Sequence, residues 1–272
     1  MLSGGLGNQM FQYALYLSLK KKGIPAVLDT SEFLLNKAHY GFELKRVFSI
    51  QDECEEFCIP VRSLFYMFKR MVVNRNSFPE RIFTYCEDVY HSQYKYLSGN
   101  WLSADYFSDI ENELRRSFTF RNISEDNLIM SKELENVESV SIHIRCGDYF
   151  SHSRYCVCND SYYKEAIQKI SSYVKAPYFY VFSDDKEWSR NFMSKLGVPF
   201  KLVSWNNGLM SYQDMFLMSK CKHNIIANST FSWWGAWLNN TPHKVVIAPS
   251  TWFTIRDVRI DYPGWELIKI KK

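Results

Sequence analysis

The 272-residue chain lacks the features of several large protein classes. It has no apolar run near the ~20 residues that a helix needs to cross a bilayer, and no charged-then-apolar leader at its start. Its net charge of +4 is small and dispersed, whereas nucleic-acid-binding domains carry a basic stripe on one face. We therefore expect neither an integral membrane segment nor a nucleic-acid partner.

Metal-binding patterns are also missing from the sequence. The seven cysteines include a C-x-C at residues 156–158, but no second pair completes a four-ligand zinc site. No Asp-x-Asp occurs, the motif that commonly holds manganese in metal-dependent sugar-nucleotide transferases. An odd number of cysteines without a leader indicates free thiols in a reduced, cytoplasmic protein. We expect no metal and no cofactor.

Apolar residues make up 46% of the chain, enough for one large core or two small ones. The first half is mixed, and we expect a helix at 10–20, a short strand at 24–28 and a helix at 105–118. From residue 138, short apolar strands alternate with helices, which predicts a parallel sheet covered on both faces. We place the domain boundary between residues 137 and 138. The strands of the second half are expected at 139–145, 178–182, 200–203, 224–227 and 244–248, and its helices at 160–174, 185–196, 211–221 and 232–238.

Three polar segments follow strands of this predicted sheet, at the edge where open parallel sheets bind ligands. The first ends in Arg145. Period-two alternation places His143 and Arg145 on the same face of their strand. An arginine fork can hold a diphosphate through two charge-assisted hydrogen bonds, and a structural salt bridge with a nearby carboxylate is the alternative.

The second segment contains Asp184 and Asp185. A carboxylate there can accept hydrogen bonds from a ribose or a guanine edge, or it can cap the following helix. The third segment, residues 228–232, leads from a strand into a helix whose first N–H groups can bind a phosphate. Plain capping by Ser229 or Ser232 is the alternative at that helix.

A glycine-rich segment, GGLGNQM, lies at residues 4–10. It departs from the dinucleotide fingerprint because Met10 stands where glycine or alanine is required. No Walker lysine pattern occurs either. If the chain stabilises a charged leaving group, Arg145 and helix N–H groups must do so in place of a metal.

Four segments together resemble glycosyltransferase family 11, the α-1,2-fucosyltransferases. The matching stretches are GGLGNQMFQYA at 4–14, HIRCGDY at 143–149, FSDD at 182–185 with Trp188, and HNIIANSTFSWWGAWL at 223–238. They occur in the family's order across nearly the whole chain, and the last stretch is long and highly specific.

The resemblance implies a GT-B fold, with two Rossmann-like α/β domains facing a cleft. Residues 1–137 would form the acceptor-side domain, and residues 138–272 the domain that binds GDP-fucose. The implied reaction is an inverting, metal-independent transfer of L-fucose from GDP-β-L-fucose to the 2-hydroxyl of a terminal β-galactoside, giving an α-1,2 linkage. A bacterial, cytoplasmic enzyme of glycan or O-antigen biosynthesis is implied, and peripheral contact with a lipid-linked glycan is compatible with it.

Site residues carry over from the family by position. Arg145 would hold the diphosphate, and His143 and Asp184 would help to hold the guanosine. The turn after the strand at 224–227 would bind phosphate oxygens through Ser229, Thr230 and Phe231. Arg145 and helix N–H groups would then stabilise the charge on the leaving diphosphate.

The N-terminal loop contributes Gly5, Gly7 and Asn8 to the implied donor site, and Asn8 would reach across the cleft toward the fucose and the diphosphate. Asp148 is the candidate general base, although it can equally pair with the nearby arginine, and the leaving phosphate can take the proton itself. The family usually has a second arginine where Cys146 stands, a departure that bears on donor binding.

Other functions stay open at this point. The chain can be a transferase for another GDP-sugar or another acceptor hydroxyl, or a carbohydrate- or GDP-binding homologue with weakened catalysis. A nicotinamide-dependent oxidoreductase is the third alternative, and the failed fingerprint argues against it. Neither the natural acceptor nor the oligomeric state follows from the sequence.

Overall fold

The computed structural model of the protein describes residues 1–35, 38–50, 55–58, 77–79, 84–94, 96–145, 157–254 and 258–270. Its contacts divide the chain into two compact units, Met1–Arg121 (unit 1) and Asn122–Lys272 (unit 2).

The division between the units lies before the boundary that we placed at residue 137. Helix α6 (Glu125–Glu135) belongs to unit 2, where it packs against α10 and bonds to strands of the sheet. On α6, Glu133 accepts a hydrogen bond from the Tyr180 hydroxyl at 3.1 Å and pairs with Lys201 at 2.9 Å. The roles that we assigned to the two domains stay predictions.

Unit 2 is built on a six-stranded sheet in which every neighbouring pair of strands is parallel. Its elements after α6 are β5 (Ser139–Ile144), α8 (Asp160–Tyr173), β6 (Tyr178–Ser183), α9 (Lys186–Leu196), β7 (Phe200–Val203), η4 (Gly208–Met210), α10 (Tyr212–Lys220), β8 (His223–Ile225), α11 (Thr230–Leu238), β9 (Val246–Pro249) and β10 (Glu266–Ile268).

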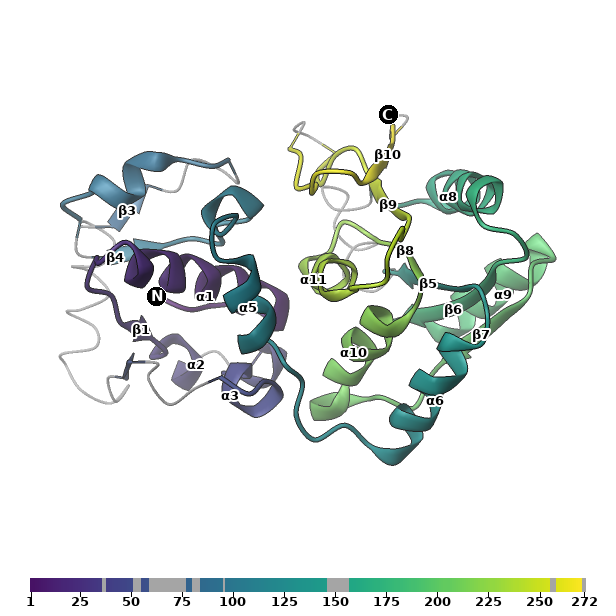
Figure 1. Ribbon diagram of the computed structural model, residues 1–272, viewed down its shortest axis with the longest axis horizontal. Helices are drawn as coiled ribbons and strands as arrows, with labels where there is room; N and C mark the ends of the chain where they lie inside the picture. Colours follow the sequence, from purple (N-terminus) through teal and green to yellow (C-terminus); the bar gives the residue numbers. More distant parts are fainter. Residues whose placement is uncertain are drawn as a thin grey trace. The chain divides into compact units, whose positions relative to one another are not determined.

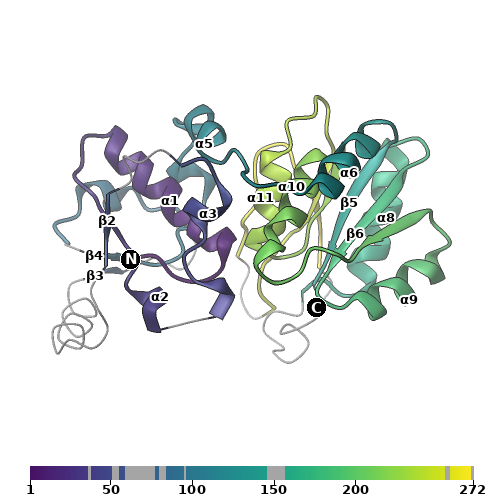
Figure 2. The same cartoon turned by 90° about the horizontal axis from the view of Figure 1, so that it is seen from below.

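The strand order is β10-β9-β8-β5-β6-β7, the order of a Rossmann-type, doubly wound sheet. Figures 1 and 2 show α8 and α9 on one face of the sheet and α10 and α11 on the other. The expected parallel sheet covered on both faces is thus confirmed. The edge strand β10 is an addition that the sequence pattern did not predict.

The two faces of β5 are buried in different ways. Val140, Ile142 and Ile144 belong to an apolar core that also contains residues of α8, as the period-two pattern predicted. On the other face, the Ser141 hydroxyl accepts a hydrogen bond from Asn224 Nδ2 at 2.7 Å, and the same amide group donates to the Met218 carbonyl at 2.8 Å. Buried polar groups on this face are therefore paired with each other.

Helices α10 and α11 pack closely because α11 contains a glycine at the contact. A Cβ on Gly235 would lie 2.9 Å from the Met218 Cβ. Each of Trp233, Trp234 and Trp237 is less than 2% exposed, so these tryptophans form core. They fix α11 against the rest of unit 2.

The start of α8 agrees with the expected span of 160–174. Asn159 is its N-cap and accepts a hydrogen bond from the Tyr162 N–H at 3.1 Å, and asparagine is among the best N-cap residues.

Unit 1 is made of shorter elements, arranged around its longest helix (Figure 1). They are α1 (Leu6–Lys21), β1 (Leu28–Asp29), α2 (Glu32–Leu35), η1 (Ala38–Tyr40), α3 (Leu44–Val47), β2 (Glu56–Phe57), β3 (Ser77–Pro79), η2 (Glu87–His91), β4 (Tyr96–Ser98), η3 (Ala104–Tyr106) and α5 (Glu111–Ser117).

Parallel pairing in unit 1 joins β1 to β2 and β3 to β4. The helix expected at 105–118 is in fact two elements, η3 and α5, because Ile110 leaves helical geometry with φ −128° and ψ 17°. The strand expected at 24–28 is reduced to β1. Ahead of α1, the Leu2 N–H donates to the Asp29 carbonyl at 2.9 Å, which joins the start of the chain to β1.

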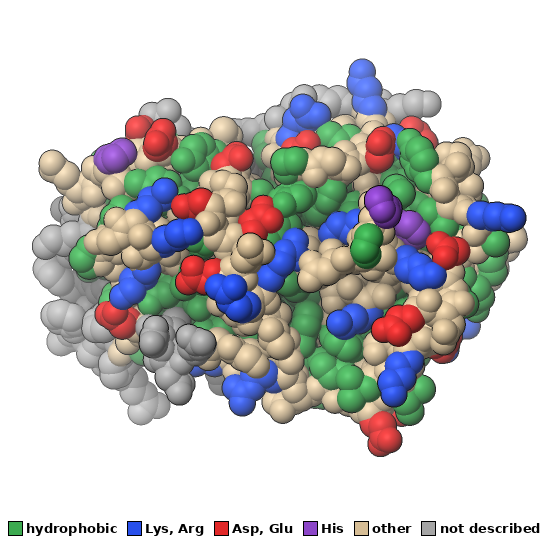
Figure 3. Space-filling view, in the orientation of Figure 1, with side chains coloured by type: hydrophobic (Ala, Val, Ile, Leu, Met, Phe, Trp, Pro, Cys, Tyr) green, Lys and Arg blue, Asp and Glu red, His purple; other side chains and the backbone are tan. Residues whose placement is uncertain are grey.

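Among the described residues, no helix is long and apolar enough to cross a membrane. On the face drawn in Figure 3, basic side chains are interspersed with acidic and apolar ones over both units. The expected dispersal of charge is seen on that face.

Candidate functional site

The carboxyl ends of β5 and β8 meet at the centre of the unit 2 sheet. These two strands pair with each other, and the chain then leaves β5 toward β6 on one side, while β8 leads to β9 on the other. Loops that diverge in this way leave a crevice between them, and doubly wound sheets bind ligands there. His143 lies near the end of β5, Arg145 and Asp184 directly follow β5 and β6, and residues 229–231 come after β8, so the fold brings these residues to this edge.

His143 lies near the end of β5 and is 7% exposed. Its ring contacts that of Phe231 in the first turn of α11, with centroids 6.1 Å apart. Burial, and after it the charge of Arg145, lowers the pKa of His143 to about 4, so the imidazole is neutral at pH 7 with one donor and one acceptor nitrogen. Its Nδ1 is buried and has no hydrogen-bond partner among the described residues.

A buried polar atom of this kind costs about 1–3 kcal/mol when it is left unsatisfied. Such atoms are rare in folded proteins and are found at functional sites or beside unseen polar groups. His143 is therefore the strongest indication of a ligand site in the described part of unit 2.

Arg145 follows β5 directly, and its backbone is held by α8. The Tyr163 hydroxyl donates to the His143 carbonyl at 3.1 Å, and the Arg145 N–H donates to the same hydroxyl at 3.3 Å. The Arg145 side chain is 28% exposed, and its Nε lies 3.9 Å from Asp184 Oδ2, whose side chain is 35% exposed. A long, partly exposed pair of this kind contributes about 0–1 kcal/mol to stability.

The two aspartates after β6 have separate roles. The Asp185 carboxylate accepts a hydrogen bond from the Trp188 N–H at 2.9 Å and caps α9. Asp184 stands beside Arg145 instead. The sequence left these roles open, and the structure assigns capping to Asp185 and leaves Asp184 at the sheet edge.

The N-terminus of α11 differs from that of α9 in how it is capped. Ser229 occupies the N-cap position and is buried, but its side chain makes no capping hydrogen bond in the described part of the chain. The Ser232 hydroxyl donates to the Ser229 carbonyl at 3.3 Å, so neither serine acts as the plain cap that we considered. Thr230 and Phe231 form the partly exposed first turn, and the positive end of the helix dipole lies at this turn.

The remaining predicted residues lie elsewhere or outside the description. Asp148 and Cys146 lie outside the described residues. Gly5, Gly7 and Asn8 belong to unit 1, where Gly5 is the N-cap of α1 and the other two are in its first turn. Gly7 is buried, whereas Asn8 is partly exposed.

Gly4 shapes the loop ahead of α1. It has φ +76°, a conformation that favours glycine. A Cβ there would also lie 2.7 Å from Asn8 Nδ2. The Asn8 side chain thus lies directly against the Gly4 backbone, in space that another residue at position 4 would occupy.

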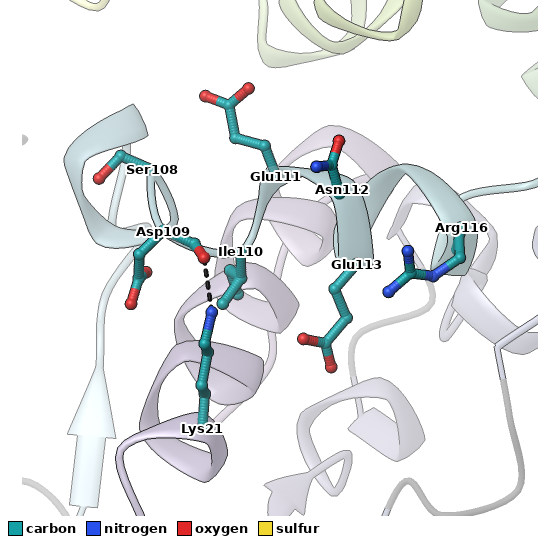
Figure 4. Close-up of a pocket in the computed structure, with 8 residues that line it drawn as sticks. All are labelled: Lys21, Ser108, Asp109, Ile110, Glu111, Asn112, Glu113 and Arg116. Atoms are coloured by element: carbon teal, nitrogen blue, oxygen red, sulfur yellow. Dashed lines mark hydrogen bonds between the residues drawn. The ribbon is translucent and has the colours of Figure 1, made fainter.

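Unit 1 also has a polar surface hollow of about 430 Å³ between the end of α1 and the start of α5. Figure 4 shows Lys21 pointing toward the Asp109 carbonyl, to which it donates a hydrogen bond of 2.6 Å. Asp109 also pairs with Lys22 at 3.7 Å. Because these charged groups already pair with one another at the surface, the hollow is a weaker candidate than the sheet edge of unit 2.

One residue that supports the site escaped the sequence analysis. Tyr163 ties the end of β5 to α8. It lies in no recognisable motif, and the only signal for it is a pair of adjacent tyrosines in an amphipathic helix.

No group of three or more His, Cys, Asp or Glu side chains that could hold a metal ion occurs among the residues that the structure describes. The charged groups at the unit 2 sheet edge are instead one guanidinium and one carboxylate, Arg145 and Asp184. Together with a neutral imidazole and a helix N-terminus, they suit an anionic ligand that also offers hydrogen-bond donors.

Comparison with known proteins shows that the chain is similar to glycosyltransferases over nearly its whole length. A family model described as glycosyl transferase family 11 matches residues 1–265. An α-1,2-colitosyltransferase of Escherichia coli is 33% identical over 270 residues, which cover 93% of this chain and 91% of that protein. The O-antigen biosynthesis glycosyltransferase WbnK of Escherichia coli is 34% identical over 289 residues, which cover 93% of each chain.

Among solved structures, the fucosyltransferase NodZ from Bradyrhizobium is similar to this chain with a TM-score of 0.52. The two share 14% sequence identity, and the match covers 85% of this chain and 88% of NodZ. At that identity the likeness concerns the fold, which is of the GT-B type expected from the sequence.

Proposed function

The chain belongs to glycosyl transferase family 11, and from this premise we propose that it transfers L-fucose from GDP-β-L-fucose to the 2-hydroxyl of a terminal β-galactoside. The product is an α-1,2 linkage, formed with inversion at the anomeric carbon and without a metal ion. The acceptor is a glycan under construction, such as an O-antigen unit on a lipid carrier, and the reaction takes place in the bacterial cytoplasm.

One observation carries the donor assignment. At the switch point of the unit 2 sheet, the buried, neutral His143 contacts Phe231 in the first turn of α11, which has no side-chain cap from Ser229, and Arg145 follows His143 at the end of the same strand. A diphosphate needs positive charge and directed N–H donors, and this edge supplies a guanidinium and a helix N-terminus. We assign the diphosphate to Arg145 and to the turn that contains Thr230 and Phe231.

The guanosine is assigned to His143 and Asp184. A guanine presents N–H donors and a ribose presents hydroxyls, and a carboxylate accepts hydrogen bonds from either. Asp184 follows β6 and lies 3.9 Å from Arg145 Nε. Because Asp185 is occupied in capping α9, Asp184 is the carboxylate that is placed to meet the nucleoside.

In the reaction, the acceptor hydroxyl attacks the anomeric carbon from the face opposite the diphosphate. The glycosidic C–O bond to GDP breaks as the new C–O bond forms, in an oxocarbenium-like transition state by analogy with glycoside hydrolysis. Negative charge grows on the leaving phosphate, where Arg145 and the first turn of α11 stabilise it. Asn8 contacts the fucose and diphosphate, and the hydroxyl proton passes to Asp148 or to the leaving phosphate itself.

The experiment is to measure GDP release from GDP-fucose in excess EDTA, with and without lactose and other β-galactosides. Acceptor-dependent release together with an α-1,2-linked product, identified by NMR, supports the proposal. GDP binding without acceptor-dependent release from any of these acceptors contradicts it.

A second candidate differs only in the sugar that is transferred. The relative of Escherichia coli named α-1,2-colitosyltransferase is 33% identical to this chain, and colitose is the 3-deoxy analogue of L-fucose. A site that hydrogen-bonds the fucose 3-hydroxyl rejects an analogue that lacks it by up to about 10⁴-fold. Competition between GDP-fucose and GDP-colitose in the same assay therefore separates the two donors.

A further inference from the structure

The outer face of α6 exposes two adjacent large apolar side chains. Leu128 is 46% exposed and Ile129 is 60% exposed, and the exposed residues Glu125 and Lys132 lie at either end of them. Positions 125, 128, 129 and 132 follow the spacing i, i+3, i+4 and i+7, which puts their side chains on one face of a helix. These four residues form the α6 stripe, which has an apolar centre, one acidic end and one basic end.

The opposite face of α6 is fixed to unit 2. Asn127, Met130 and Leu134 are buried. The Asn127 amide donates to Asn206 Oδ1 at 2.8 Å and to Gln213 Oε1 at 2.7 Å. Figure 1 shows α6 at the lower rim of unit 2, next to α10, against which it packs. The α6 stripe therefore points away from the core of unit 2 and cannot turn inward to bury its apolar centre.

The loop between β7 and α10 adds further exposed apolar side chains beside α6. Trp205, Leu209 and Met210 are 40%, 54% and 42% exposed. Trp205 Nε1 donates to Asn127 Oδ1 at 2.9 Å, which joins this loop to α6. In the described part of unit 2, the one other large apolar side chain that is exposed is Tyr173 of α8. Single exposed apolar side chains are ordinary, whereas a group of them on adjoining segments is typical of an interaction surface.

The charges at the ends of the α6 stripe indicate which partner fits it. Glu125 and Lys132 are separated by ~10.5 Å along the helix axis, which is too far for them to pair with each other. Leu128 and Ile129 lie at the midpoint between them. In two copies packed antiparallel about a two-fold axis at this midpoint, each Glu125 faces the partner's Lys132, and each Leu128 faces the partner's Ile129. The stripe is thus complementary to itself, as a two-fold symmetric interface requires.

Other partners fit this pattern less well. A parallel pair of α6 helices would place like charges opposite each other. A membrane with anionic lipids would attract Lys132 but repel Glu125 and its exposed neighbour Asp126. Glu133, the acidic residue next to Lys132, is already paired with Lys201 at 2.9 Å. A second copy in the antiparallel direction satisfies both ends of the stripe at once.

We propose that the α6 stripe is the centre of a homodimer interface, in which the α6 helices of two copies of this chain pack antiparallel about a two-fold axis. Stable interfaces bury about 1,200–2,000 Å² in total, which is more than four side chains of one helix provide. The loop with Trp205, Leu209 and Met210 supplies the margin of the interface. This inference does not depend on the proposed function, because no residue of the interface is assigned to a substrate.

The test is the molar mass of the full chain in solution, measured by analytical ultracentrifugation from about 1 µM to about 1 mM protein. We expect a concentration-dependent species of twice the 32.3 kDa of one chain. Leu128→Gln combined with Ile129→Gln should weaken dimerisation by about 10²-fold or more, because two apolar side chains in each copy lose their burial. Both positions are exposed and glutamine is a good helix former, so the Tm and the Kd for GDP should not change.

Reversal of charge tests the antiparallel direction. Glu125→Lys and Lys132→Glu each place like charges opposite one another, twice in a symmetric dimer, and each should weaken dimerisation by about tenfold or more at low salt. The double variant Glu125→Lys/Lys132→Glu restores opposite charges and should recover most of the wild-type affinity between copies. Glu187→Lys is the matched control, because Glu187 is also an exposed acidic residue in the first turn of a helix, α9; it should dimerise like the wild type.

The outcomes are distinct for each occupant of the stripe. A wild-type monomer at every concentration overturns the proposal, and binding to vesicles of anionic phospholipid that Leu128→Gln/Ile129→Gln abolishes would then assign the stripe to a membrane. A dimer that the two glutamines leave intact shows that the copies pair through another surface. A double charge variant as weak as the single ones shows that α6 does not pair in the antiparallel direction, and either result also overturns the proposal.

Discussion

Each unit contains a helix that begins after a short polar or glycine-rich loop, and the two helix N-termini differ in the groups that surround them. In unit 1, the loop ahead of α1 is held by the buried side chain of Gln9, whose Nε2 donates to the carbonyls of Gly4 at 3.0 Å and Gly41 at 2.9 Å. In unit 2, α11 begins at a serine whose side chain forms no cap in the described part of the chain, beside a buried imidazole with an unsatisfied Nδ1.

This difference shows why glycine content is a poor guide to a phosphate site. The glycine loop of unit 1 looks more like a phosphate-binding sequence, but its backbone carbonyl at Gly4 is bonded to the buried Gln9 side chain. The α11 loop contains no glycine ahead of its helix, and yet the ring of Phe231 in its first turn contacts the buried ring of His143. A ligand site is indicated by polar groups that the chain leaves without partners.

Removal of the Arg145 guanidinium at the unit 2 terminus should have the largest effect, and that effect is on kcat. Arg145→Ala should lower kcat by about 10²–10³-fold, because the leaving diphosphate loses a charged donor. Arg145→Lys keeps the charge without the planar fork, so its kcat should lie between those of the wild type and Arg145→Ala. Acceptor-dependent GDP release measures the effect, with the exposed Arg190 of α9 replaced by alanine as a control that should not change. Near-normal turnover of Arg145→Ala would show that the diphosphate binds elsewhere.

A change beneath the unit 2 terminus should have the next largest effect. Gly235→Ala places a Cβ 2.9 Å from the Met218 Cβ, so α10 and α11 must separate. Overpacking of this kind costs about 1–3 kcal/mol, and we expect the Tm to fall by several degrees in circular dichroism melts. An unchanged Tm would mean that α11 is not held as tightly as its buried tryptophans indicate.

The loop of unit 1 can be disturbed without removing a functional group. Gly4→Ala combines an unfavourable φ of +76° with a contact of 2.7 Å to Asn8, whereas Gly23→Ala has a similar φ of +72° and meets nothing within 4 Å. Both should lose stability by about 1 kcal/mol. Only Gly4→Ala should also lower kcat, by about tenfold for a displacement worth about 1.4 kcal/mol. Equal kinetics for the two variants would separate the Gly4 contact from catalysis.

The smallest expected effect is on the pH dependence of stability. Burial raises the pKa of Glu43 from 4.5 to about 7, against the lowering effects of Arg46 and the Leu6 N–H. The folded protein therefore binds more protons than the unfolded chain between these pH values, and its stability falls as pH rises from about 4.5 to about 7. Wild type should lose more Tm than Glu43→Gln over that range.

Two other groups with shifted pKa values, Asp214 and His143, do not affect the difference in Tm between wild type and Glu43→Gln, because both proteins contain them. The pKa of Asp214 is raised to about 7 by burial, which has the same sign as Glu43. The pKa of His143 is lowered to about 4, which removes stability as pH falls below 6.5. Parallel Tm curves for wild type and Glu43→Gln would contradict the shift assigned to Glu43.

The sequence was most informative about unit 2. Buried strands such as β5 and β6 have apolar runs bounded by polar residues, and the predicted spans lie within a residue or two of the observed ones. Because parallel strands end at a common edge, the order of the strands was enough to place His143, Arg145 and Phe231 near one another. The contact between the His143 and Phe231 rings bears this out.

Other features depend on distances that a pattern does not contain. Asp184 and Asp185 are equivalent in sequence, and only the fold shows that the second one meets the Trp188 N–H. The division at residue 121 differs from the boundary expected at residue 137 because α6 bonds to partners on the unit 2 sheet that are far away in sequence.

The most direct test of this account is a crystal structure of the protein with GDP. We expect the diphosphate within hydrogen-bond distance of Arg145 and of the backbone N–H groups in the first turn of α11. A diphosphate seated at the N-terminus of α1 would contradict it.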